Sequence, residues 1–105
     1  MSTDKRESAR MALRREVLLG GRHLSNQFCQ TRDISPEGVF VETGETSLVV
    51  NNEVELVMSL PAQDGQKDYR LPARVARVTG EGVGLQFKRL GVDTFSAVLG
   101  LLYAA

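Results

Sequence analysis

Most of the chain alternates apolar and polar residues with a period of two, the pattern of strands that bury one face. The clearest stretch is 53–60, where every second residue from Val54 to Leu60 is apolar and Val57 alone breaks the polar series. Shorter stretches of the same kind predict a first strand that carries Leu13, Val17 and Leu19, and further strands at 27–34, 39–43, 69–78 and 83–88. Because parallel pairing needs crossovers longer than the intervals between these stretches, the pattern predicts an antiparallel sheet.

Turn residues separate the predicted strands. They lie at Gly20-Gly21, Gly44-Glu45, Asn51-Asn52, 61–65 and 79–82. After Gly91 the apolar period lengthens to three and four residues, which predicts a helix over about 93–103 with Asp93 as its N-cap. The sequence therefore predicts an all-β fold, a six-stranded antiparallel barrel with a C-terminal α-helix packed on it.

Before Met11 the chain is polar and shows no apolar period. Such a segment has no face to bury, so residues 1–10 are predicted to form a flexible N-terminal arm. The remaining residues, 11–105, suffice for one hydrophobic core and are too few for two, which predicts a single domain.

Composition and charge narrow the classes of function. Apolar residues make up 42% of the 105 residues and charged residues 25%, as in an ordinary globular protein. The formal net charge is zero, so attraction to nucleic acid or anionic lipid could come only from local clusters of basic residues. Since no apolar stretch is long enough to cross a bilayer or resembles a secretory leader, we expect a cytoplasmic bacterial protein without membrane insertion.

Residues that could carry catalysis or bind a metal are scarce. His23, the only histidine, follows a predicted turn and is expected at the surface, whereas the only cysteine, Cys29, is expected to be buried in a strand. The glycine-rich stretch 80–84 lacks the Gly-Lys-Ser/Thr of a phosphate-binding loop. No Cys/His cluster has the spacing of metal ligands, and we therefore predict no enzyme activity, no metal and no cofactor.

One candidate for ligand binding is a pair of arginines four positions apart on the arm, Arg6 and Arg10, with Lys5 in front of them. A guanidinium can donate two parallel hydrogen bonds to phosphate oxygens or to the O6 and N7 edge of guanine. A second pair, Arg10 and Arg14, overlaps the first, but Arg14 falls in a predicted strand and the first pair is preferred. Taken alone, such a pair is more typical of a solvated tail.

The other candidate is the stretch DISPEGVF, residues 33–40. Asp33 and Ser35 can bond to nearby backbone groups and tighten a turn, and Gly38 can take a positive φ or admit a close backbone approach. If the strand continues, Asp33 and Ser35 point the same way, and the carboxylate can accept hydrogen bonds from the N1–H and N2–H₂ groups of guanine. By itself this stretch fits a simple turn as well as a site, and the arginine pair shifts the balance toward a site.

This combination resembles the PilZ domain family, whose signature is an RxxxR on an N-terminal arm followed by DxSxxG between two strands. The stretches GVFVET, LPARVARV and GVGLQF are also similar to later strands of PilZ domains. The resemblance implies a split barrel and a bacterial receptor for cyclic di-GMP, with the arm folded over a ligand on the barrel surface. Arg6 and Arg10 would then contact phosphates and guanines. Asp33 and Ser35 would bond a guanine, and Gly38 would leave space for the ligand.

One departure from the PilZ pattern lies at the start of the arm. Many members carry a further arginine where this chain has Lys5. Lysine keeps the positive charge but lacks the planar fork of donors, so Lys5 is the less certain member of the expected site.

The resemblance implies a sensor that binds cyclic di-GMP and passes the signal to an effector protein through ordering of the arm. Two alternatives stay open: a PilZ-fold adaptor that contacts proteins without binding nucleotide, and a small nucleic-acid-binding barrel. The zero net charge and the few aromatic residues argue against the last, so no nucleic-acid partner is expected. The apolar face of the last helix, which includes Leu101 and Leu102, leaves a homodimer open.

Overall fold

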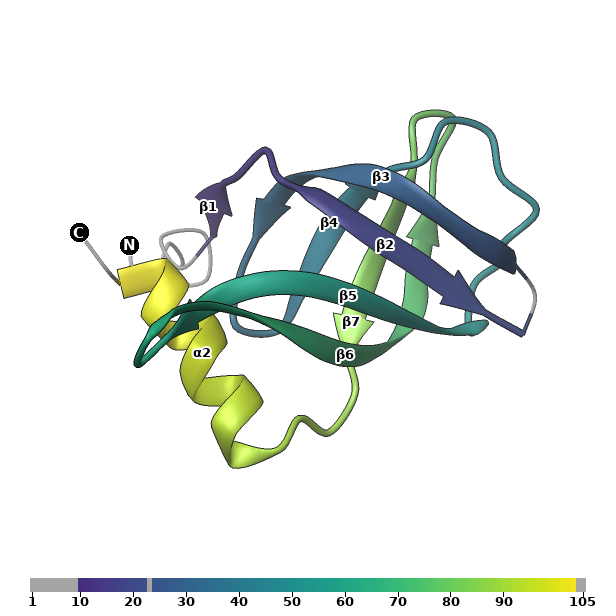
Figure 1. Ribbon diagram of the computed structural model, residues 1–105. Coiled ribbons are helices and arrows are strands. Elements are labelled where there is room, and N and C mark those ends of the chain that lie inside the picture. The colour runs from purple at the N-terminus through teal and green to yellow at the C-terminus, as the bar shows by residue number, and fades with distance from the viewer. Residues whose placement is uncertain (1–9, 23, 104–105) are drawn as a thin grey trace, which may run out of the picture.

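Six strands close into an antiparallel barrel, and one helix lies against it (Figure 1). The computed structural model describes residues 10–22 and 24–103. Within these residues the strands are β1 (Met11–Ala12), β2 (Glu16–Gly21), β3 (Leu24–Ile34), β4 (Gly38–Glu42), β5 (Glu53–Ala62), β6 (Gly65–Val78) and β7 (Val83–Phe87), and the helix is α2 (Val92–Tyr103). His23 and residues 1–9 of the predicted arm lie outside the described residues.

The barrel closes through the pairing of β3 with β4. Its strands follow the order β3-β2-β5-β6-β7-β4, and β4 pairs back with β3, all in antiparallel fashion. β1 is a short addition that pairs with the end of β3. The all-β class, the antiparallel sheet and the six-stranded barrel predicted from the sequence are therefore confirmed.

The predicted first strand is interrupted. β1 and β2 both run along β3, and residues 13–15 between them leave the regular ladder. Their backbone remains bonded to β3, because the amide of Leu13 donates to the carbonyl of Arg32 at 2.9 Å and the carbonyl of Arg15 accepts from Thr31 at 3.0 Å. The chain from β1 to β2 thus stays beside β3 throughout, and the interruption is a local irregularity of the pairing.

One predicted turn is wrong, and another is shorter than predicted. Gly20 and Gly21 belong to β2, and the chain reverses after them. A Cβ on Gly20 would lie 1.9 Å from Oδ1 of Asn26, so this glycine permits close packing by the neighbouring strand. The turn predicted at 61–65 is present but comprises only Gln63 and Asp64, because β5 continues to Ala62 and β6 begins at Gly65. Pro61 is tolerated there because β5 pairs with β2 only near its start, so the missing N–H removes no bond on that side.

The C-terminal helix packs on the barrel as predicted, with a different start. α2 begins at Val92, and the amide of Phe95 donates to the carbonyl of Gly91 at 2.9 Å. Asp93 therefore lies in the first turn and is not the N-cap, although its charge still complements the positive end of the helix dipole. Ala97 and Val98 are buried, and the helix contacts β5 and β6.

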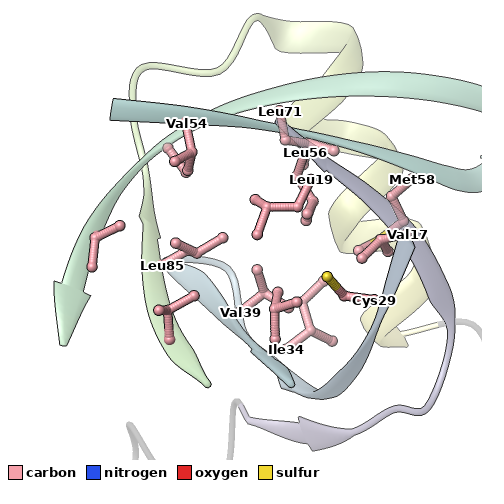
Figure 2. Packing of buried hydrophobic residues seen from close by; sticks show 14 of the residues in the cluster. Val17, Leu19, Cys29, Ile34, Val39, Val54, Leu56, Met58, Leu71 and Leu85 are labelled. Atoms are coloured by element: carbon pink, nitrogen blue, oxygen red, sulfur yellow. The ribbon is translucent and has the colours of Figure 1, made fainter. Parts of the chain in front are cut away.

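Apolar side chains from every barrel strand fill the interior (Figure 2). Leu19, Leu56 and Leu71 are fully buried and lie close together in this view, and Cys29 is buried among the core residues, as predicted. Burial of each large aliphatic side chain stabilises the fold by about 1.5–3 kcal/mol. In the part of the chain that the structure describes, no helix has the length and apolar character needed to cross a membrane.

Candidate ligand-binding groove

The pairing of β1 with β3 determines where Arg10 lies. Met11 pairs with Ile34 and Ala12 with Asp33, so Arg10 is placed beside the end of β3. The segment that follows is held firmly, since the buried Thr31 hydroxyl donates to the carbonyl of Leu13. The attachment point of the arm is therefore fixed against the barrel.

A bulge in β3 determines the direction of Asp33. The register against β4 shifts between Thr31 and Asp33, which leaves Arg32 as the extra residue. Strict alternation would place Asp33 inside the barrel with Thr31, but the bulge sets it opposite Phe40, on the outer face. A one-residue irregularity thus directs the Asp33 carboxylate outward.

Arg10 and Asp33, both predicted from the sequence, are in direct contact. The Nη1 atom of Arg10 donates to Oδ1 of Asp33 in an ion pair. The Arg10 side chain is 50% exposed and that of Asp33 24% exposed. An ion pair this accessible to water stabilises a fold by about 0–1 kcal/mol, so a ligand with better-matched groups could replace it at small cost.

Ser35 lies in a tight turn and does not extend the strand. β3 ends at Ile34, and the chain reverses over residues 35–38, with Ser35 N donating to the Gly38 carbonyl at 2.8 Å. The Ser35 hydroxyl is buried and accepts from the amides of Glu37 and Gly38, both at 3.3 Å. The strand does not continue to Ser35, so the condition under which Asp33 and Ser35 would share one face is not met.

Gly38 is required by close packing of the barrel wall. It does not have a positive φ, so one of the two reasons considered for a glycine here does not apply. A Cβ would lie 2.1 Å from the carbonyl oxygen of Leu85 on β7, which leaves no room for any side chain. This close approach, and not space for a ligand, is the reason that the structure gives for the glycine.

A groove of about 480 Å³ brings the predicted residues together. Its lining contains three of them, Arg10, Ser35 and Gly38, and Asp33 borders it through its bond to Arg10. The rest of the lining is Glu37, Val39, Phe40, Ala76, Arg77, Gly84, Leu85 and Gln86. A larger hollow of about 760 Å³ lies between the β5–β6 hairpin and α2, but it contains none of the predicted residues, so we place the site in the smaller groove.

Of the other candidate basic residues, the structure describes Arg14 alone, and it does not line the groove. Lys5 and Arg6 lie outside the described residues. Arg14, which completes the overlapping arginine pair, lies 3.5 Å from Oε1 of Glu42 in an ion pair and does not line the groove.

Sequence reasoning missed the aromatic centre of the site. Phe40 is 3% exposed although its neighbours Val39 and Val41 belong to the barrel core, so its ring lies on the outer face beneath other side chains. Arg32 and Arg77 place their guanidinium carbons 4.3 and 5.6 Å from the ring centroid. Three consecutive apolar residues in β4 indicate a strand covered on both faces, and this signal could have identified Phe40.

The two arginines on Phe40 differ in their electrostatic surroundings. Arg32 donates to Glu81 at 2.6 Å and to Glu42 at 3.3 Å. The hydrogen bond to Glu81, followed by that to Glu42, raises the pKa of the Arg32 guanidinium. Arg32 therefore belongs to a structural ion-pair network, in which the two glutamates balance its positive charge.

The sequence from residue 4 to residue 104 matches the PilZ domain family. The chain belongs to this family. The match spans the barrel, the helix and part of the arm, and PilZ domains are binding and regulatory modules. No curated protein sequence matches the chain.

Solved PilZ structures share the fold at low sequence identity. The PilZ domain of CeSA from a cellulose-synthesising bacterium has a TM-score of 0.72 and 21% identity, over 90% of this chain and 95% of that one. The Bacillus subtilis inhibitor of motility, MotI/DgrA, has a TM-score of 0.78 and 16% identity, over 91% of this chain. MrkH of K. pneumoniae, solved in complex with c-di-GMP, has a TM-score of 0.64 and 21% identity, over 90% of this chain. The aligned part is 48% of the chain length of both MotI and MrkH.

Proposed function

We propose that this PilZ domain is a non-catalytic sensor that binds cyclic di-GMP in the groove beside Arg10. The observation that carries the proposal is the assembly of Arg10, Ser35 and Gly38 around one groove, with Asp33 bonded to Arg10 at its edge. Arg10 is more than twenty residues away from the other three in the chain, and the β1–β3 pairing brings it to them. The family of the chain supports the choice of ligand.

The chemistry of the groove suits a guanine nucleotide. Arg10 offers a planar set of donors to phosphate oxygens or to the O6 and N7 atoms of guanine. Among the described residues, Oδ2 of Asp33 has no hydrogen-bond partner, so this oxygen can accept from the N1–H and N2–H₂ donors of guanine. Ser35 supports the site by holding the turn, since its hydroxyl is already bonded to the turn amides. Arg6 and Lys5 would supply further positive charge from the arm.

The arm would transmit the binding of the ligand to a partner protein. Binding of the nucleotide to Arg6 and Arg10 would draw residues 1–10 onto the outer face of the barrel and change the surface offered to an effector protein. We place this exchange in the bacterial cytoplasm, with a separate protein as effector. Amide hydrogen exchange at residues 1–10 should slow on addition of cyclic di-GMP, and unchanged exchange at saturating ligand would contradict this route.

Ligand binding should also stabilise the fold. At a cyclic di-GMP concentration one hundred times the Kd, the free energy of unfolding should rise by about 2.7 kcal/mol, because the ligand binds only the folded state. The melting temperature should rise with cyclic di-GMP and stay unchanged with GTP or cyclic di-AMP at the same concentration. Equal shifts with all three nucleotides would argue against recognition of two guanines.

A second candidate function, a protein adaptor that needs no nucleotide, is favoured by an apolar row on the barrel in which Phe28 is exposed and Leu18 and Val57 are partly buried. Phe28 is 70% exposed, and it pairs across the sheet with Leu18, which in turn pairs with Val57. Replacement of Phe28 by Ser should leave the free energy of unfolding within about 0.5 kcal/mol of wild type, because the ring is largely in solvent. A partner that binds the wild type with and without nucleotide, and fails to bind Phe28→Ser, would favour the adaptor.

A further inference from the structure

A single cross-strand row links the predicted site to residues that the sequence did not suggest. Asp33 on β3 pairs with Phe40 on β4, Phe40 pairs with Gly84 on β7, and Gly84 pairs with Arg77 on β6. Adjacent strands lie about 4.8 Å apart, so the row extends roughly 14 Å across the outer face of the barrel. Its two ends carry opposite charges.

Arg77 reaches this face through a second bulge. The register of β6 against β7 shifts between Val75 and Arg77, which leaves Ala76 as the extra residue. Val75 is fully buried, and strict alternation would also direct Arg77 into the core. The bulge sets Arg77 opposite Gly84 and makes it exposed. Two bulges, one in β3 and one in β6, thus place Asp33 and Arg77 on the same outer row.

Gly84 leaves a path along which Arg77 crosses to Phe40. A Cβ on Gly84 would lie 3.5 Å from Nε of Arg77 and 3.8 Å from Cδ2 of Phe40, so both side chains lie directly over this glycine. The guanidinium carbon of Arg77 lies 5.6 Å from the centre of the Phe40 ring, within the range of a cation–π contact. Phe40 thereby supports the guanidinium of Arg77 above the floor of the groove.

Among the residues that the structure describes, Arg77 has no partner of opposite charge, whereas Arg32 has two. Within residues 10–22 and 24–103, Arg77 makes no ion pair and donates no side-chain hydrogen bond, whereas Arg32 is bonded to two glutamates. Arg77 lines the same groove as Arg10. A supported guanidinium with unused donors beside a second arginine is suited to an anionic ligand rich in paired acceptors.

We propose that Arg77 is a further ligand-contacting residue of the groove. Its guanidinium, supported by the Phe40 ring, donates to a pair of acceptors on the nucleotide. The acceptors are either two phosphate oxygens or the O6 and N7 atoms of guanine, which present the same geometry to a guanidinium. At one end of the row, the Asp33 carboxylate accepts hydrogen bonds from the ligand. At the other end, the Arg77 guanidinium donates hydrogen bonds to it. This inference rests on the proposed binding of cyclic di-GMP.

The test is calorimetric titration of four proteins with cyclic di-GMP: wild type, Arg77→Ala, Arg77→Lys and Arg70→Ala. Arg70 is the matched control because it lies on the same strand, is exposed and is paired with Glu55. Arg77→Ala should weaken binding about 10- to 100-fold, as expected for loss of a charge-assisted hydrogen bond, and Arg70→Ala should bind within about twofold of wild type. A urea titration of each variant checks that the fold is retained.

The lysine variant distinguishes the two kinds of acceptor. If Arg77 contacts phosphate, Arg77→Lys should keep part of the lost affinity, because a point charge suffices; if it contacts the guanine edge, Arg77→Lys should bind as weakly as Arg77→Ala. Wild-type affinity in Arg77→Ala, or an equal loss in Arg70→Ala, would overturn the role of Arg77 and leave the proposed function standing. Absence of binding by the wild type would overturn both.

Discussion

Replacement of Gly38 by Ala is expected to lower the free energy of unfolding by about 3 kcal/mol, near the upper end of the usual cost of overpacking. The new Cβ would lie 2.1 Å from the carbonyl oxygen of Leu85, well inside contact distance. That oxygen belongs to the backbone of β7, which pairs with β4 on one side and β6 on the other. Relief of the clash therefore requires displacement of a strand, and a flexible side chain cannot absorb it.

Urea unfolding of Gly38→Ala beside Gly80→Ala measures this effect. A Cβ on Gly80 would meet nothing within 4 Å, and its φ is not positive, so this control should stay within about 0.5 kcal/mol of wild type. The melting temperature of Gly38→Ala should fall by more than about 10 °C. A Gly38→Ala protein as stable as the control would show that the β4–β7 contact is looser than described and would reopen the role of this glycine in ligand binding.

Replacement of Arg10 by Ala is expected to remove most of the affinity for cyclic di-GMP, on the order of 2 to 4 kcal/mol or roughly 30- to 1000-fold in Kd. Arg10 lines the groove and bonds to Asp33, so its loss removes a donor to the ligand and leaves the carboxylate unpaired. The fold should be nearly unaffected, because an ion pair between partly exposed groups contributes about 0–1 kcal/mol. Calorimetric titration, with a urea titration for stability, separates the two effects.

Arg14→Ala is the matched control for this variant. Arg14 is the neighbouring arginine of the overlapping pair, its side chain is 66% exposed, and it is paired with Glu42 outside the groove. Its replacement should leave the affinity unchanged. A larger loss in Arg14→Ala than in Arg10→Ala would transfer the site to the second arginine pair and contradict the assignment made from the β1–β3 pairing.

The class of the fold and its antiparallel barrel could be predicted because apolar alternation survives in most strands. The period of two in 53–60 and the period of three to four after Gly91 correspond directly to β5 and α2. The ends of strands were less predictable, because glycine and proline occur within strands as well as in turns. Gly20 lies within β2 and accommodates a neighbouring side chain, so it does not mark a turn. Pro61 pairs with Gln66 as part of β5, and the turn predicted at 61–65 is limited to Gln63 and Asp64.

Candidate site residues could be proposed from the sequence where a residue type carries its own chemistry. Arg10, Asp33 and Ser35 were proposed because their side chains can bond a guanine nucleotide and because their spacing resembles the PilZ signature. The direction of each side chain was not predictable, since bulges change alternation by one residue without a clear sequence signal. The outward directions of Asp33 and Arg77 both depend on such bulges, and the sequence analysis therefore did not suggest Arg77.

Isothermal titration of the purified wild-type protein with cyclic di-GMP, with GTP and cyclic di-AMP as controls, tests the central claim most directly. We predict saturable binding that is selective for the guanine dinucleotide, and the stoichiometry will distinguish one bound molecule from a stacked pair. Absence of heat, together with an unchanged melting temperature at high ligand concentration, would contradict the sensor function. The turn at Ser35–Gly38 would then be a structural element of a protein-binding adaptor.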